Sequence, residues 1–191
     1  MTSSKVAMAS SEISDHRVLL SGAGGFLGRQ LARYLAARGV KLRALVRDAS
    51  TLKARNPDLQ FESVAEWQAG RENQAVLDTL LEGVTTVVHL ASTTSSQAGD
   101  RQETHLAMPE ALLDAASGSS VQRFISLSSV KAVAGEAHPS PLVPDAIPAP
   151  NSDYGRFKLA AEKLVSEHRA NSALATYTLR LPMVYALELA G

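Results

Sequence analysis

The sequence predicts an α/β protein in which helices cover both faces of a parallel β-sheet, an arrangement called doubly wound. From residue 17 onward, short apolar runs alternate with longer segments whose apolar residues recur every three or four positions. Such alternation is typical of strand–helix–strand units and of a parallel sheet. The chain has 191 residues, of which 45% are hydrophobic and 20% charged, and these values suit one globular domain with a sizeable core.

Six apolar runs predict six strands. Each run is short and is bounded by turn residues, as buried strands are, and the third is the weakest. We place them at Arg17–Ser21, Lys41–Val46, Leu59–Val64, Val84–Leu90, Val121–Leu127 and Leu174–Leu181.

Four segments between these strands have the periodicity of helices that bury one face. In the first of them Leu27, Leu31 and Leu35 share a face, and Gly39 is suited to end the helix. The four segments are Phe26–Arg38, Asn73–Leu81, His105–Ala116 and about Asp153–His168.

Composition excludes several classes of function. The 19 basic residues balance 19 acidic ones, so we expect no nucleic-acid partner bound by phosphate neutralisation. The absence of cysteine excludes disulfides and thiolate ligands, and the five histidines lack metal-ligand spacing, so we expect no metal site. No apolar run approaches the roughly 20 residues that span a bilayer, so we expect no membrane partner.

Residues 1–16 are rich in Ser, Thr and Ala and contain a single Lys. They have neither the apolar core of a signal peptide nor the Arg-rich pattern of a transit peptide. We interpret them as a disordered extension or a vector-derived leader before a single domain over 17–191, and we expect a cytoplasmic protein.

A glycine cluster, Ser-Gly-Ala-Gly-Gly-Phe-Leu-Gly over residues 21–28, joins the first strand to the first helix. Gly22, Gly25 and Gly28 are spaced by three, and Gly24 adds a fourth glycine. A tight turn in this context lets backbone N–H groups approach a pyrophosphate at the helix N-terminus. The alternative is a glycine-rich turn without a ligand.

With these residues the chain resembles the extended short-chain dehydrogenases/reductases, the NAD-dependent epimerase/dehydratase family, over about residues 17–185. The His89–Ser92 segment is similar to the family's "HLAA" segment, and Arg180–Tyr185 to its "RPxxVYG" segment. The resemblance implies an NAD(P)-binding Rossmann fold. The cofactor contacts that we expect from it are Gly22, Gly25, Phe26, Leu27, Gly28, Leu90, Ala91, Ser92, Tyr154, Lys158 and Pro182.

Tyr154 and Lys158 form a Tyr-x-x-x-Lys motif whose spacing places both side chains on one helix face. A free phenol has a pKa near 10, and a nearby ammonium together with a cationic nicotinamide ring favours the phenolate. Lowering the phenol pKa by about three units requires roughly 4 kcal/mol. Tyr154 would then exchange a proton with a substrate oxygen while hydride moves to or from the nicotinamide. The alternative is an exposed Tyr–Lys pair on a helix.

Ser129 ends the fifth strand, 25 residues before Tyr154. The resemblance implies that the Ser129 hydroxyl binds the substrate oxygen beside Tyr154, the general acid/base, while Lys158 also holds the nicotinamide ribose. Ser128 is the alternative if the register slips by one residue.

Arg47, just after the second strand, favours NADP(H), because arginine there accommodates the 2′-phosphate of NADP. Arg43 and Lys53 are further candidates for that contact. Asp48 keeps NAD(H) open, because an acidic residue at this end of the strand binds the ribose 2′-hydroxyl of NAD. A surface arginine without a ligand is the remaining alternative.

The sequence departs from the family pattern at two places. Glu66 and Trp67 stand where relatives have Gly-Asp-Leu, so we assign Glu66 as the substitute near the adenine and expect Trp67 in the core. His105 replaces the usual Asn, and we favour a structural role for it over a catalytic one. His89, in a predicted strand, is expected to be a core residue.

The leading hypothesis is hydride transfer at a sugar carbon of a nucleotide-sugar, as in a 4-epimerase or a 4-keto reductase. Residues 128–136 are similar to the "SSIKVNGE" stretch of bacterial UDP-sugar enzymes, with one extra residue. An NADPH-dependent reductase of a non-sugar ketone and an NADP-binding module without turnover are the alternatives. The resemblance further implies a homodimer and a C-terminal substrate lobe that is largely missing here, as in a truncated product or a fragment.

Overall fold

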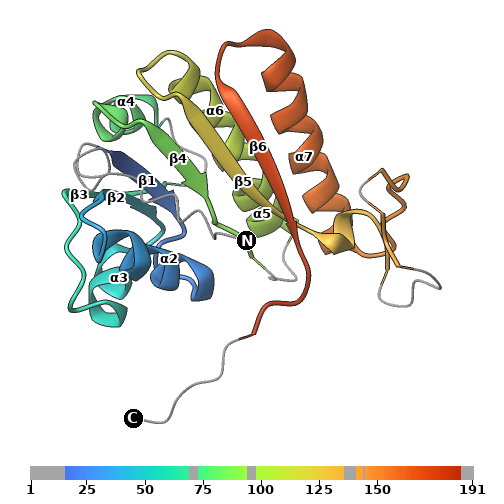
Figure 1. Ribbon diagram of the computed structural model, residues 1–191, viewed down its shortest axis with the longest axis horizontal. Helices are drawn as coiled ribbons and strands as arrows, with labels where there is room; N and C mark the ends of the chain where they lie inside the picture. The colour runs from blue at the N-terminus through green and yellow to red at the C-terminus, as the bar shows by residue number, and fades with distance from the viewer. Residues whose placement is uncertain (1–15, 69–72, 94–97, 136–140, 144, 186–191) are drawn as a thin grey trace, which may run out of the picture.

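The computed structural model describes residues 16–68, 73–93, 98–135, 141–143 and 145–185. Six parallel strands form one sheet in the order β3-β2-β1-β4-β5-β6 (Figure 1). This order confirms the doubly wound α/β fold that the sequence predicts. The strands are β1 (Arg17–Ser21), β2 (Lys41–Val46), β3 (Ser63–Glu66), β4 (Thr86–His89), β5 (Arg123–Ser129) and β6 (Ala175–Leu181).

Helical segments connect the strands, and they include one π-helical and one 3₁₀ segment. None of the helices in the described residues is long and apolar enough to cross a membrane. The segments are α2 (Phe26–Ala36), α3 (Ala49–Arg55), α4 (Gln74–Leu81), α5 (Ala98–Gln102), η1 (Glu103–Ala107, π), α6 (Met108–Ser117), η2 (Val130–Ala132, 3₁₀) and α7 (Asp153–Asn171). The extension predicted over residues 1–16 lies outside the described residues except for His16.

The structure differs from the predicted elements around β3 and α3. The third strand begins at Ser63, and Leu59 and Phe61 of the predicted strand instead pack beside the core before the strand starts. Helix α3 is not predicted, because its seven residues bury only Leu52 and therefore show no apolar periodicity. Helical structure also starts at Ala98, ahead of the predicted start at His105.

Two apolar cores lie on opposite faces of the sheet. On one face Leu19, Val87 and Phe124 of the strands pack with residues of α4, α6 and α7. On the other face Val18 and Leu20 pack with residues of α2 and α3. The strands β1, β2, β4 and β5 therefore contribute alternate residues to the two cores, as the pleat of a strand dictates.

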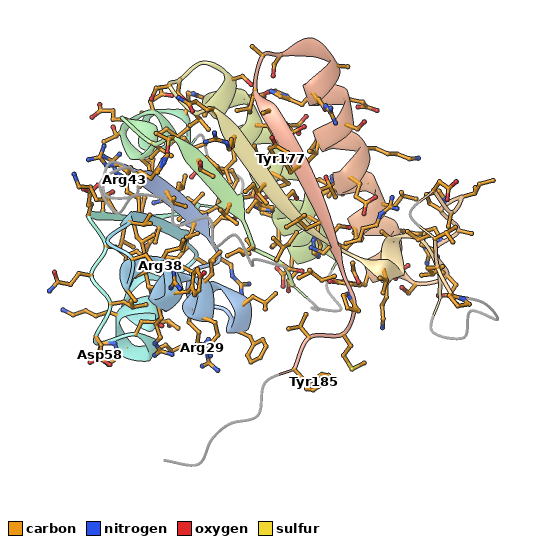
Figure 2. All side chains as sticks on the ribbon, in the orientation of Figure 1. Arg29, Arg38, Arg43, Asp58, Tyr177 and Tyr185 are labelled. Carbon is orange, nitrogen blue, oxygen red and sulfur yellow. The ribbon has the colours of Figure 1, made fainter. Side chains whose placement is uncertain are left out.

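The described residues cover the second face only in part. In Figure 1 the ribbons of β5 and β6 face the viewer with no helix in front of them. An apolar groove of about 1020 Å³ lies here, beside α2. We call the strand residues that line it the open face: Val18, Thr86, Val88, Ile125, Leu127, Leu179 and Leu181. Tyr177, labelled in Figure 2, is half exposed and lies on the same face of β6 as Leu179.

Candidate active site

The turn between β1 and α2 depends on two glycines. Gly22 has a φ of +75°, and a Cβ there would lie 2.7 Å from the backbone N of Ala91. A Cβ on Gly28 would lie 2.1 Å from the carbonyl oxygen of Gly22. The turn, the first turn of α2 and the segment after β4 therefore pack backbone to backbone, which any side chain would prevent.

The N-terminus of α2 is open to a ligand. Its N-cap, Gly25, makes no side-chain capping hydrogen bond, and the first turn has no acidic residue. In contrast, Asp48 caps α3 and Ser152 caps α7. The first N–H groups of a helix need partners, and the helix dipole favours an anion there. A pyrophosphate therefore fits the turn.

A cleft of about 420 Å³ runs along this turn. Gly24 also lines it, and a Cβ on Gly24 would have no neighbour closer than the Leu52 side chain at 3.7 Å. Six predicted cofactor residues line the cleft: Gly22, Gly25, Arg47, Leu90, Ala91 and Ser92. Seven others do not line it: Phe26, Leu27, Gly28, Glu66, Tyr154, Lys158 and Pro182.

Positive side chains form one end of the cleft, where Arg47 and Arg55 are both lining residues. The carboxylate of Asp48 instead accepts hydrogen bonds from the backbone and hydroxyl groups of Ser50 and Thr51. These bonds hold the pKa of Asp48 well below its usual range. Glu66 accepts a bond of 2.8 Å from the backbone N of Ala49. Both carboxylates thus bind groups in the first turn of α3.

A buried hydrogen-bond network fixes the wall of the cleft that follows β4. The Ser21 Oγ lies 2.7 Å from the Nδ1 of His89 and accepts bonds from the backbone N of Leu90 and of Ala91 at 3.2 and 3.4 Å. Burial, and then the nearby charges of Lys158 and His105, lower the pKa of His89 to about 3. The imidazole is therefore neutral. Because the Ser21 Oγ already accepts two bonds, its hydroxyl donates the hydrogen bond to the Nδ1 of His89. His89 is the core residue that the sequence predicts.

Tyr154 and Lys158 lie side by side at the start of α7. The Lys158 Nζ is 5.8 Å from the centre of the Tyr154 ring and donates a hydrogen bond of 3.0 Å to the carbonyl oxygen of Leu127 in β5. Burial lowers the pKa of Lys158 to about 8, and the charge of Glu162 opposes that shift. Lys158 therefore remains mainly protonated at pH 7 and places a positive charge beside the Tyr154 ring.

The two serines that end β5 have different surroundings. Ser129 accepts a bond of 3.2 Å from the backbone N of Lys131 and so caps η2. The Ser128 Oγ is buried and has no hydrogen-bond partner among the residues that the structure describes. Both serines lie at the carboxyl end of β5, beside the Leu127 carbonyl that holds Lys158.

Sequence reasoning missed two features of the site. Arg55 lies in α3 and lines the cleft. The sequence did not predict this helix, because the helix has no apolar periodicity, and therefore it did not predict Arg55 as a site residue. The role of Ser21 depends on contacts with residues about 70 positions away, which no local pattern reveals. Trp67 is in the core as expected, where its Nε1 donates to Glu103 at 2.8 Å.

Together these features define an α/β protein with a glycine turn that suits a pyrophosphate and a Tyr–Lys pair at the carboxyl ends of its strands, the edge where such sheets bind ligands. A model of the NAD dependent epimerase/dehydratase family matches residues 18–188. The chain belongs to this family, which confirms the resemblance seen in the sequence.

Two curated relatives and one solved structure illustrate the similarity. A 4-hydroxy-2-methyl-3-oxo-4-farnesyl-3,4-dihydroquinoline-1-oxide ketoreductase of Stigmatella aurantiaca is 29% identical over 78% of this chain and 45% of its own length. Sterol demethylase protein B of Methylococcus capsulatus is 33% identical over 75% of this chain and 44% of its own length. The chain therefore spans about half the length of these relatives.

The solved structure is MoeE5 in complex with UDP-glucose and NAD. It is 26% identical, with a TM-score of 0.69 over 86% of this chain and 53% of its own. It shares its fold with this chain, and it is in complex with NAD as well as UDP-glucose.

Proposed function

We propose that this chain carries the cofactor-binding and proton-transfer residues of an NADP(H)-dependent oxidoreductase that interconverts a ketone and a secondary alcohol. When bound, the nicotinamide would exchange a hydride with the substrate carbon. Tyr154 gives a proton to the substrate oxygen in reduction and takes one in oxidation. The Lys158 ammonium stabilises the phenolate, and Ser129 hydrogen-bonds the substrate oxygen.

The observation that carries this proposal is the placement of Lys158. Its charged group is buried, lies against the Tyr154 ring and is tied to the end of β5, next to the two serines. Burying an ammonium is costly unless its charge is used or paired. An exposed Tyr–Lys pair would have neither this burial nor this anchor.

The preference for NADP(H) over NAD(H) rests on the charges of the cleft. Arg47 and Arg55 line one end of it, while Asp48 and Glu66 are occupied by the first turn of α3. The phosphate that distinguishes NADP from NAD would thus meet two guanidinium groups, which bind phosphate well.

For the substrate, we propose a nucleotide-sugar first, since the similar structure of MoeE5 binds UDP-glucose. A non-sugar ketone is the second candidate, because one curated relative is a ketoreductase of a quinoline oxide. Thermal-shift assays with UDP separate the two. Stabilisation by UDP supports the nucleotide-sugar, and the absence of stabilisation by any nucleoside diphosphate disfavours it.

The first test concerns Arg47. We expect Arg47→Ala to weaken NADPH binding about tenfold or more, the loss of a charge-assisted phosphate contact, and to leave NADH binding nearly unchanged. Isothermal titration with both cofactors measures this effect. Arg33→Ala, on the exposed part of α2, is the matched control. Equal losses for the two cofactors would refute the 2′-phosphate contact.

The second test concerns Tyr154. We expect Tyr154→Phe to abolish hydride transfer and to leave cofactor affinity nearly unchanged, because the proton donor is lost while the cleft is intact. The assay follows NADPH absorbance with a panel of UDP-4-keto sugars and simple ketones. Tyr177→Phe, on β6, is the control. Substantial turnover by Tyr154→Phe would exclude the acid/base role.

A further inference from the structure

His105 lies where the cofactor cleft meets the helix that carries Tyr154. It is 2% exposed and belongs to the π-helical segment η1. Its neighbours Thr104 and Met108 line the cleft. Short π-helical turns inside longer helices occur frequently at functional sites.

One end of the His105 ring is tied to the wall of the cleft. Its Nε2 lies 3.0 Å from the carbonyl oxygen of Thr93, which follows the wall residues Leu90, Ala91 and Ser92. A carbonyl oxygen only accepts, so Nε2 carries a hydrogen in this arrangement.

The faces and edge of the same ring contact α7. The His105 and Tyr154 rings are 5.9 Å apart and nearly perpendicular, at 79°. The Phe157 ring stacks on His105 at 6.1 Å and 28°. Such edge-on and stacked contacts fix ring orientation. His105 is thus wedged between two aromatic residues of α7, one turn apart.

These two sets of contacts require different properties of one side chain. The contacts with Tyr154 and Phe157 need a flat ring, and the contact with Thr93 needs an N–H group at the end of that ring. Phenylalanine would supply only the flat ring, and glutamine would supply only the N–H group. An apolar residue would fill the space without the cost of burying a polar group, so packing alone does not account for a histidine.

We propose that His105 is a positioning residue that couples the wall of the cofactor cleft to the phenol of Tyr154, so that an occupied cleft fixes the orientation of that phenol. This inference rests on the proposed function. Tyr154 is a titratable group in contact with His105, and His89 interacts electrostatically with both His105 and Lys158.

The test is NMR of the chain labelled with ¹³Cζ-tyrosine, titrated with pH in the presence and absence of NADP⁺. The chain has only four tyrosines, and Tyr154→Phe assigns the signal. In the unmodified chain we expect NADP⁺ to lower the pKa of Tyr154 by about one unit or more, the effect of a nearby positive charge. In His105→Phe, which keeps the ring, we expect less than half of that lowering.

His105→Gln, which keeps an N–H group, is the second variant, and circular dichroism establishes that each variant is folded. The inference is overturned if NADP⁺ lowers the Tyr154 pKa equally in the unmodified chain and in the folded variants. If the unmodified chain binds NADP⁺ without any change at Tyr154, the proposed function fails and the inference fails with it. The Tyr34 signal, on exposed α2, is the internal control.

Discussion

At the scale of single residues, the glycines of the β1–α2 turn serve two different purposes. Gly28 is required by the fold, because a Cβ there would overlap the Gly22 carbonyl. Gly24 is not, because its surroundings have room for a methyl group. Gly24 instead keeps the cleft open, because it lines the cleft without a side chain.

This difference predicts distinct outcomes for two substitutions. We expect Gly28→Ala to destabilise the chain by more than about 3 kcal/mol, as backbone overlap does, or to prevent folding. Gly24→Ala should change stability by less than about 1 kcal/mol and weaken NADPH binding. Urea unfolding and cofactor titration measure the two effects, and comparable losses of stability would contradict the assignment.

His89 predicts a loss of stability in acid. The unfolded chain binds a proton at His89 below about pH 6.5, whereas the folded chain does not until about pH 3. The free energy of unfolding therefore falls as the pH falls through this window, by an amount on the order of 4 kcal/mol at its lower end.

Urea unfolding between pH 7 and pH 4 tests this prediction. In His89→Asn, whose side chain does not titrate, the free energy of unfolding should depend less steeply on pH than in the unmodified chain. Parallel pH dependences would show that His89 is protonated equally in both states.

The sequence predicted the placement of individual candidate residues where that placement follows from local spacing. Tyr154 and Lys158 share a helix face, and Gly22 and Gly25 line the cleft, because these placements follow from neighbouring residues. Two contacts were not predictable: the hydrogen bond from the backbone N of Ala49 to Glu66, and the contact of His105 with Thr93. Both depend on which distant backbone group the fold brings near.

At the scale of elements, the start of α7 positions Tyr154. The Ser152 Oγ accepts a bond of 3.1 Å from the backbone N of Gly155. A Cβ on Gly155 would lie 2.2 Å from the Lys131 carbonyl oxygen, so this turn packs directly on η2. The cap and the glycine together hold the first turn of α7 against the end of β5.

We expect Ser152→Ala to lower stability by about 1 kcal/mol, or about 3 °C in Tm for a domain of this size. The capping bond is lost, and the first turn of α7 frays. Calorimetry measures the effect, and Ser166→Ala, on the exposed side of the same helix, is the control. Equal Tm values for the two variants would show that the cap contributes nothing.

Two strands were located residue by residue from their short apolar runs. Strands β1 and β2 lie at their predicted positions. Strand β3, with only two half-buried positions, and the short helix α3 were misplaced or missed, because neither buries enough residues to show a period. The π-helical turn at η1 has no sequence pattern that would reveal it.

At the scale of the whole molecule, the two faces of the sheet are not equally covered. Helices α4, α6 and α7 bury one face, whereas the open face keeps an apolar groove beside α2. Parallel sheets are normally covered on both faces. An exposed apolar surface of this kind is a site of association or of dye binding.

We expect this chain to bind the dye ANS at the open face. Leu179→Lys, a half-exposed position there, should lower ANS fluorescence at least about twofold, because a charge replaces apolar contact area. Ile147→Lys, at an exposed loop position outside that face, should leave the fluorescence unchanged. Equal signals from both variants would place the dye elsewhere.

The order of strands has a consequence for how the molecule is assembled. Strand β4 pairs with β1, although about 70 residues separate Ser21 from its partner His89. The residues that line the cleft come both from before β4 and from after it in the sequence, so neither half of the chain can form the cleft alone. Because such long-range pairing is slow to form during folding, recovery of NADPH binding after dilution from urea should lag behind the recovery of helical circular dichroism.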